Sequence, residues 1–200
     1  MKKFGKIFEK VPLTIYTITL YASPFAGMGL AVGLSELSSK FENETVQGIF
    51  LAAAFVSLLL CFVFYHIMWV INFIFGAKNA VLASGKGRIT GKGCLIYKLL
   101  QIPYHCLFFL FCLLWVGAAA NPFLMWSYIF LPLAVLHSFC VMLSVSIYGI
   151  SRAIRLKRDD AITTGKMAAI IILLLIFVLD FIGAIMLIFA DKAQSENPEL

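Results

Sequence analysis

The sequence predicts an all-α integral membrane protein built as a five-helix transmembrane bundle, and three observations favour that class. The chain of 200 residues is 62% hydrophobic and 13% charged, whereas soluble domains average about 45–50% apolar and about 25% charged residues. The apolar residues form continuous runs rather than the alternating segments of about ten residues found in membrane β-barrels. Backbone polar groups inside a bilayer need partners in their own segment, so each run is expected to be a helix.

Five runs are long enough to cross the roughly 30 Å hydrocarbon layer, which takes about 20 residues. We expect them to form a single transmembrane domain over residues 1–200. The runs are residues 11–34, 47–75, 95–119, 122–150 and 167–190.

The first run follows a basic head, so its cleavage as a signal peptide is an alternative that leaves four spans. The third and fourth runs follow each other closely. As one helix over residues 95–150 they would be about 80 Å long, beyond the thickness of any bilayer. Asn121-Pro122 is a turn signal whose proline suits the first turn of a helix, so we place the break there.

Lysine and arginine predict the orientation of these spans. Of the 16 Lys and Arg residues, all except Lys40 and Lys192 lie within the segments 2–10, 78–98 and 152–166. Five spans bring these three segments to one side, which the positive-inside rule makes cytoplasmic. The N-terminus is then cytoplasmic, the C-terminus lies outside, and the protein belongs to the cell membrane. The net charge of +6 therefore reflects orientation, with the lipid bilayer and no nucleic acid as partner.

A short motif occurs twice and suggests an internal repeat. Ile89-Thr90-Gly91-Lys92 precedes the third span, and Ile162-Thr163-Thr164-Gly165-Lys166 precedes the fifth. The spans that come before these loops carry one histidine each, His66 and His137. These matches favour two tandem helical hairpins plus an N-terminal helix, although basic helix starts select the same residue types without any repeat.

Two ionisable residues lie near the middle of the last two spans, where such groups are costly and usually face protein or water. Asp180 lies in the fifth span, and Gly183 on its face allows a neighbouring helix to approach closely. His137 lies in the fourth span, as far from the loop at residues 158–159 as Asp180. We therefore predict a hydrogen bond or ion pair between His137 and Asp180, an intramembrane polar pair that is either functional or a structural contact.

A second polar cluster consists of His66, Lys98, Gln101 and His105. His66 and His105 flank the loop near residue 86 almost symmetrically, so we expect them at matched depth, as packing partners or as the two ligands of one haem. Lys98, Gln101 and His105 share a helix face that leads to the cytoplasmic side. Lys98 either extends to the surface or lines a water-filled crevice with the other two.

The remaining patterns bear on function. Gly29 and Gly33 form a GxxxG pattern, which is typical of helix packing in membranes. No HExxH, GxSxG, P-loop or CxxC motif occurs, so no metal, cofactor or enzymatic activity is expected. The prediction is a non-enzymatic membrane subunit or accessory factor that contacts other membrane proteins or a second copy of itself. The alternative is a small transporter or proton-linked channel that uses His137 and Asp180.

Overall fold

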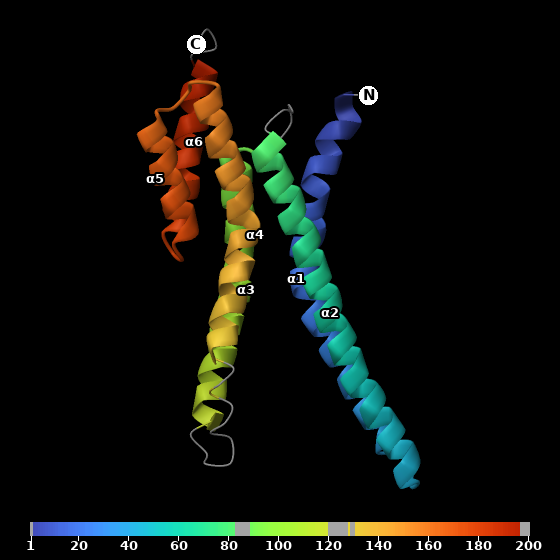
Figure 1. Ribbon diagram of the computed structural model, residues 1–200. Helices are drawn as coiled ribbons and strands as arrows, with labels where there is room; N and C mark the ends of the chain where they lie inside the picture. The colour runs from blue at the N-terminus through green and yellow to red at the C-terminus, as the bar shows by residue number, and fades with distance from the viewer. Residues whose placement is uncertain (1, 83–88, 120–127, 129–130, 197–200) are drawn as a thin grey trace. The chain divides into compact units, whose positions relative to one another are not determined.

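The regular structure is helical throughout the part of the chain that the computed structural model describes, which is residues 2–82, 89–119, 128 and 131–196. Six helices lie within these residues (Figure 1), and four of them are long and apolar enough to cross a membrane. The all-α class predicted from the sequence is therefore confirmed. The helices are α1 (Lys2–Ser38), α2 (Glu44–Leu82), α3 (Gly91–Ala119), α4 (Leu131–Arg158), α5 (Thr164–Leu175) and α6 (Asp180–Glu196).

One compact unit, Thr14–Asn72, is an antiparallel hairpin of α1 and α2. The hydroxyls of Tyr16 and Tyr65 are hydrogen-bonded at 3.1 Å. Further along α1, the hydroxyl of Ser23 donates to the carbonyl of Cys61 at 2.8 Å. The sequence separation of the bonded residues falls from 49 to 38 between these two contacts, as an antiparallel pair requires.

The other unit, Met1–Leu13 with Phe73–Leu200, is organised around α4. Figure 1 shows α5 and α6 beside the half of the antiparallel α3–α4 pair that holds the start of α3 and the end of α4. Glycine makes these contacts close, since a Cβ added to Gly149 would lie 2.9 Å from Leu174 of α5 and 3.1 Å from Cys94 of α3. Buried apolar side chains from α4, α5, α6 and the α4–α5 loop form the core, namely Ala153, Leu156, Ile162, Ile170, Leu174, Leu187 and Ala190.

The predicted fifth span, residues 167–190, is not one helix. α5 ends at Leu175 after 12 residues, the chain turns over residues 176–179, and α6 begins at Asp180. α6 then returns beside α5, so close that a Cβ added to Gly183 would lie 2.9 Å from Leu174. The prediction was wrong because an unbroken apolar run fits two short antiparallel helices as well as one long helix.

The end of α6 also lies beside segments that the prediction placed on the other side of a membrane. Asp191 accepts the backbone N–H of Gly91 at the start of α3 and pairs with Arg152 near the end of α4. Both partners belong to the basic segments 78–98 and 152–166, which the prediction separated from the C-terminus by the thickness of a membrane. The extra turn brings the end of α6 back to the level at which α5 began, and the side of a membrane on which the C-terminus lies stays a prediction.

The other predicted spans correspond to helices with wider bounds. Residues 11–34, 47–75 and 95–119 fall within α1, α2 and α3. The predicted turn at Asn121-Pro122 and the first residues of the span 122–150 lie outside the described residues, and α4 continues to Arg158.

The repeated motif marks two helix starts. Thr90 accepts the N–H of Gly93, and Thr163 accepts the N–H of Lys166, so each threonine caps a helix. However, α3 has 29 residues and α5 has 12, so the two predicted hairpins are not equivalent.

Candidate functional site

A buried ion pair joins three helices of the unit that contains α3 to α6. The ammonium of Lys98 on α3 lies 2.5 Å from Oδ2 of Asp180 on α6 and donates to Oγ of Ser146 on α4 at 2.9 Å. The side chains of Lys98 and Asp180 keep only 1% and 6% of their exposure. Burying either charge alone would be costly, so each makes the burial of the other acceptable.

The interruption between α5 and α6 puts Asp180 at this point. The turn makes Asp180 the first residue of α6, where the dipole of the helix favours a carboxylate. Lys98 lies about two turns into α3. The side chain of Lys98 therefore meets the start of α6 inside the bundle, at the end of the α5–α6 hairpin where the chain turns.

Polar side chains continue along α3 beyond the ion pair. Gln101 is 2% exposed, and its amide donates to the carbonyl of Val141 on α4 at 3.0 Å. One turn further, Nδ1 of His105 lies 3.2 Å from the hydroxyl of Ser138. The structure thus brings Lys98, Gln101 and His105 onto one polar seam, which we define as these three side chains and their contacts with α4.

Imidazole and aromatic rings lie beside the far end of this seam. The hydroxyl of Tyr104 lies 2.6 Å from Nε2 of His137 on α4, and the ring of Phe108 packs 5.3 Å from the same imidazole. Phe177, in the turn between α5 and α6, packs edge-on against His105 with 5.3 Å between ring centroids. The tip of the α5–α6 hairpin therefore contacts α3 at the seam.

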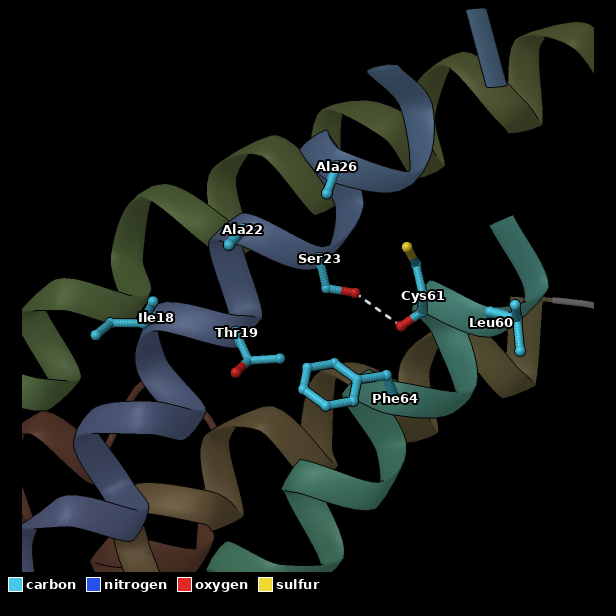
Figure 2. Close-up of a pocket in the computed structure, with 8 residues that line it drawn as sticks. All are labelled: Ile18, Thr19, Ala22, Ser23, Ala26, Leu60, Cys61 and Phe64. Carbon is cyan, nitrogen blue, oxygen red and sulfur yellow. Dashed lines mark hydrogen bonds between the residues drawn. The ribbon is translucent and has the colours of Figure 1, made fainter. Parts of the chain in front are cut away.

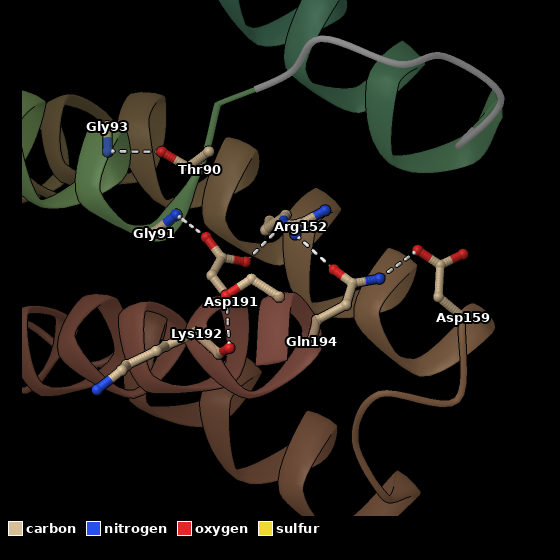
Figure 3. Close-up of polar contacts among 9 residues, drawn as sticks. Thr90, Gly91, Gly93, Arg152, Asp159, Asp191, Lys192 and Gln194 are labelled. Atoms are coloured by element: carbon tan, nitrogen blue, oxygen red, sulfur yellow. Dashed lines mark hydrogen bonds and ion pairs between the residues drawn. The ribbon is translucent and has the colours of Figure 1, made fainter. Parts of the chain in front are cut away.

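A second polar network holds the open end of the hairpin (Figure 3). Asp191 uses both carboxylate oxygens, one 2.6 Å from the backbone nitrogen of Gly91 and the other 2.7 Å from Nε of Arg152. Arg152 also donates to Gln194 at 2.9 Å, and the amide of Gln194 donates to Asp159 at 3.0 Å. We call these five residues the rim network, and they tie the end of α6 to α3 and α4.

An apolar groove of about 370 Å³ opens between α1 and α2 in the unit Thr14–Asn72 (Figure 2). The hydroxyl of Ser23 in its wall is bonded to the carbonyl of Cys61 and offers little to a polar ligand. The groove is lined by Ile18, Thr19, Ala22, Ser23, Ala26, Leu60, Cys61 and Phe64.

Comparison with known protein families matches residues 12–194 to a family described as being of unknown function, DUF6652. The chain belongs to the DUF6652 family. No curated protein and no solved structure matches this DUF6652 chain.

The hydrogen bond predicted between His137 and Asp180 is not formed in this DUF6652 protein. Asp180 pairs with Lys98, and His137 bonds to Tyr104. The prediction matched depths along a single fifth helix. Because the chain turns back after α5, Asp180 lies level with Ser146, and residues 137 and 146 are about 13 Å apart along α4.

His66, the remaining member of the predicted second cluster, lies on α2 in the other unit. Its Nδ1 is 2.8 Å from the carbonyl of Phe62, one turn earlier in the same helix. Its ring packs against Phe62 and Tyr65 at centroid distances of 4.1 and 5.0 Å. These are contacts of a packed side chain, and the described residues contain no group of three or more His, Cys, Asp or Glu that is placed to hold a metal ion.

The three glycines predicted at packing faces differ in their surroundings. Gly183 lies against Leu174, as described above. A Cβ added to Gly29 or Gly33 would meet nothing within 4 Å, so among the described residues the GxxxG face of α1 has no close neighbour.

Sequence reasoning identified Lys98 and Asp180 but not the bond between them. Opposite charges inside apolar segments of one chain are expected to pair. Comparing the charged residues of all spans, rather than of neighbouring spans, would have predicted the pair of Lys98 and Asp180. Nothing in the sequence marks Ser146 or Tyr104. Chemically, the cluster offers an ion pair with no net charge. Among the described residues, donors are hydrogen-bonded to only one oxygen of the Asp180 carboxylate.

Proposed function

We propose that this DUF6652 protein is a four-span membrane protein that acts as a non-enzymatic membrane subunit or accessory factor. Its four candidate spans expose large apolar side chains, such as Phe55 on α2, Leu114 on α3 and Val135 on α4. A bilayer covers such faces, and helices satisfy the backbone inside it. The basic segments 78–98 and 152–166 then lie in the cytoplasm together with the N-terminus.

The α5–α6 hairpin enters and leaves this membrane from the cytoplasmic side. α5 is about 18 Å long, little more than half of the roughly 30 Å hydrocarbon layer. The turn exposes the apolar side chains of Phe177 and Val178, whereas the rim network at the open end is polar. Helix ends at membrane depth are tolerated where they are packed in protein, as Asp180 is. The C-terminus is then cytoplasmic as well.

The closed Lys98–Asp180 pair is the observation that carries this proposal. It fastens α6 to α3 and α4, and the outer faces of the described helices carry exposed apolar side chains that can contact lipid or other helices. A paired charge inside a bundle favours one arrangement of the helices, because other arrangements leave a charge unpaired. A bundle fixed in this way is suited to presenting a constant surface to a partner in the membrane.

The test is isolation of the tagged full-length chain after crosslinking in its own membrane, followed by mass spectrometry and light scattering. The proposal expects a partner membrane protein in fixed stoichiometry or a defined homo-oligomer. Asp180→Asn should lose that partner, and the matched control Asp160→Asn, at an exposed carboxylate, should keep it. A monomer that carries no stoichiometric partner would reject the proposal.

A second function, proton-linked transport, is favoured by the interruption between α5 and α6. Transporters place their binding sites at discontinuous helices near the middle of the membrane, and Asp180 begins the second half of such a helix pair. The Tyr104–His137 contact lies beside the polar seam further along α3 and α4. In this role His137 and Asp180 act at separate positions rather than as a bonded pair.

Purified protein in liposomes with a pH gradient and an internal pH-sensitive dye tests transport. Asp180→Asn should abolish the flux, Asp180→Glu should retain part of it because it keeps the charge, and Asp160→Asn should leave it unchanged. Equal flux with wild-type and Asp180→Asn protein, both monodisperse in gel filtration, would exclude this function.

A further inference from the structure

We propose that α1 forms a symmetric dimer with α1 of a second copy, in which small residues of the two helices cross and Phe25 of each copy enters the groove of the other. The inference rests on the membrane insertion proposed above, since two copies inserted in the same orientation can present this face to each other. It adds a contact surface in the unit Thr14–Asn72, which does not contain the Lys98–Asp180 pair.

Four small residues form a stripe along α1. Ala22, Ala26, Gly29 and Gly33 follow one another at intervals of four, three and four residues, which puts them on one face of a helix. All four are exposed. Inside a membrane, a face of this kind lets the backbone of another helix approach closely.

The two glycines of the stripe have no close neighbour among the described residues. Glycine weakens the interior of a helix relative to alanine, yet a Cβ at Gly29 or Gly33 would meet nothing within 4 Å. Gly27, on the face of α1 that packs on α2, is different, because its Cβ would lie 3.2 Å from that of Cys61. The neighbour that favours glycine on the stripe is therefore expected in another molecule.

The groove between α1 and α2 runs along one edge of the stripe, since Ala22 and Ala26 line it together with Phe64 of α2 (Figure 2). Two hydroxyls in its wall are already engaged within the α1–α2 hairpin. Thr19 and Ser23 each donate to a backbone carbonyl at 2.8 Å. The occupant that fits this groove is therefore an apolar group without hydrogen-bonding atoms.

Phe25 offers such a group at the opposite edge of the stripe. Its side chain is 67% exposed, and it lies at the level of the groove, directly before Ala26. At 3.6 residues per turn, Phe25 and the groove residue Thr19 fall on either side of Ala22. A two-fold axis between two parallel stripes brings the Phe25 edge of each copy opposite the groove edge of the other. One geometry therefore fills both grooves.

Charged side chains at the outer end of the stripe favour a second copy as the occupant. Glu36 follows Gly33 on the same face, and Lys40 comes one turn later, just after α1 ends. Both are exposed, and the ion pairs formed by described residues include neither of them. In a parallel dimer, Glu36 of each copy lies near Lys40 of the other, so the two faces are complementary in charge. A lipid acyl chain would fill the groove but accounts for neither the glycines nor these charges.

Disulfide crosslinking of the full-length chain in its own membrane tests the contact. Ala22→Cys and Val63→Cys are compared in a chain whose five native cysteines are replaced by alanine. The positions lie at similar levels, because Ser23 is bonded to Cys61. Both are exposed, but Val63 is two residues from Cys61 and lies on the far side of α2. Oxidation should link Ala22→Cys chains into dimers and leave Val63→Cys chains as monomers.

Dissociation constants test the stripe and the groove separately, by energy transfer between labelled copies diluted in liposomes. Gly33→Leu should weaken the dimer roughly tenfold or more, because it overpacks the crossing. Phe25→Ala should also weaken it, because the groove of each copy loses its occupant. Met28→Ala is the matched control, since Met28 is 62% exposed on a face of α1 turned away from the stripe. It should leave the dissociation constant unchanged.

Charge reversal identifies a contact between copies. Glu36→Lys places like charges opposite each other and should weaken the dimer by roughly two- to fivefold, as expected for exposed ion pairs. Glu36→Lys/Lys40→Glu restores opposite charges and should recover the affinity of the wild type. Asp180→Asn should leave this dimer intact, because the Lys98–Asp180 pair belongs to the other unit.

Three results would overturn the inference. They are equal crosslinking of Ala22→Cys and Val63→Cys, an unchanged dissociation constant in both Gly33→Leu and Phe25→Ala, and a wild type that stays monomeric at every ratio of protein to lipid, as it would if acyl chains fill the groove. A monomer that holds another membrane protein in fixed stoichiometry would overturn the dimer but not the proposed function. An α1 dimer without any partner that depends on Asp180 would support the dimer and count against the role proposed for the bundle.

Discussion

Lys98 can be buried because its ammonium group lies beside an acidic partner. Its ammonium donates to the carboxylate of Asp180 on α6 and to the hydroxyl of Ser146 on α4. If either charged partner is removed, the other remains in surroundings that exclude water. Two apolar side chains of similar volume would avoid this problem. At the scale of residues, the pair therefore specifies the position of α6 more than it adds stability.

Single and double substitutions of the pair test that interpretation. Lys98→Met leaves the carboxylate unpaired, and Asp180→Leu leaves the ammonium unpaired, so each should lower stability by about 3–5 kcal/mol. The double variant Lys98→Met/Asp180→Leu should unfold close to wild type. Denaturant unfolding in detergent, followed by circular dichroism, measures all three. Losses that simply add in the double variant would show that the two side chains are not coupled.

Gly91 lies against the backbone of α6 at the open end of the hairpin. A Cβ at this position would lie 2.6 Å from the backbone nitrogen of Ile188 and from the carbonyl carbon of Leu187, neither of which is a flexible side-chain end. Gly91→Ala should therefore displace α6 and lower stability by about 1–3 kcal/mol. Gly165→Ala is the matched control, because it lies in the first turn of α5 with nothing within 4 Å. An equal effect of the two changes on the unfolding midpoint would contradict the contact.

The sequence predicted which polar side chains matter better than how they pair. Lys98, Gln101 and His105 follow each other at helical spacing, so their common face could be derived from α3 alone. Their partners lie on α4 and α6, and choosing among these requires the relative positions of whole helices. His137 and Asp180 were predicted to lie at the same depth because residues 167–190 were expected to form one helix, and the chain forms two helices there.

At the scale of elements, the α5–α6 hairpin depends on a turn without turn residues. Residues 176–179 are Ile, Phe, Val and Leu, and no glycine, proline or asparagine marks the reversal. The contacts that hold the reversal are tertiary, since Leu174 packs on Gly183 and Asp180 pairs with Lys98. Local sequence patterns cannot report such contacts, which is why one helix was predicted where the structure has two.

Val178 offers a direct test of this turn. A β-branched residue at φ 74° is strained, and its side chain is 66% exposed, so glycine loses little burial. Val178→Gly should therefore raise stability by about 1 kcal/mol. Val135→Gly, at a position 70% exposed within α4, should instead lower it by about 0.5 kcal/mol. If both variants unfold at lower denaturant than wild type, the turn is not strained at Val178.

For the whole molecule, the hairpin changes the relation between charge and topology. In the proposed arrangement of four spans and a hairpin that returns to its own side, Lys192 would join the other basic residues in the cytoplasm. Of the 16 Lys and Arg residues, all except Lys40 then lie on that side. The bias is stronger than in the five-span arrangement, in which Lys192 lay outside. Charge and the observed helices therefore favour the same topology.

Reporter fusions decide between the two topologies at three positions. A fluorescent protein fused after Lys86 or after Leu200 should fluoresce, and alkaline phosphatase at these positions should be inactive, because both points are cytoplasmic in the four-span arrangement. Phosphatase fused after Phe41, in the loop between α1 and α2, should be active outside. The fusion after Leu200 separates the alternatives, since five spans would make its phosphatase active. The same fusion on Lys98→Met/Asp180→Leu should stay cytoplasmic, because α5, at about 18 Å, is too short to cross roughly 30 Å of hydrocarbon even when the ion pair is absent.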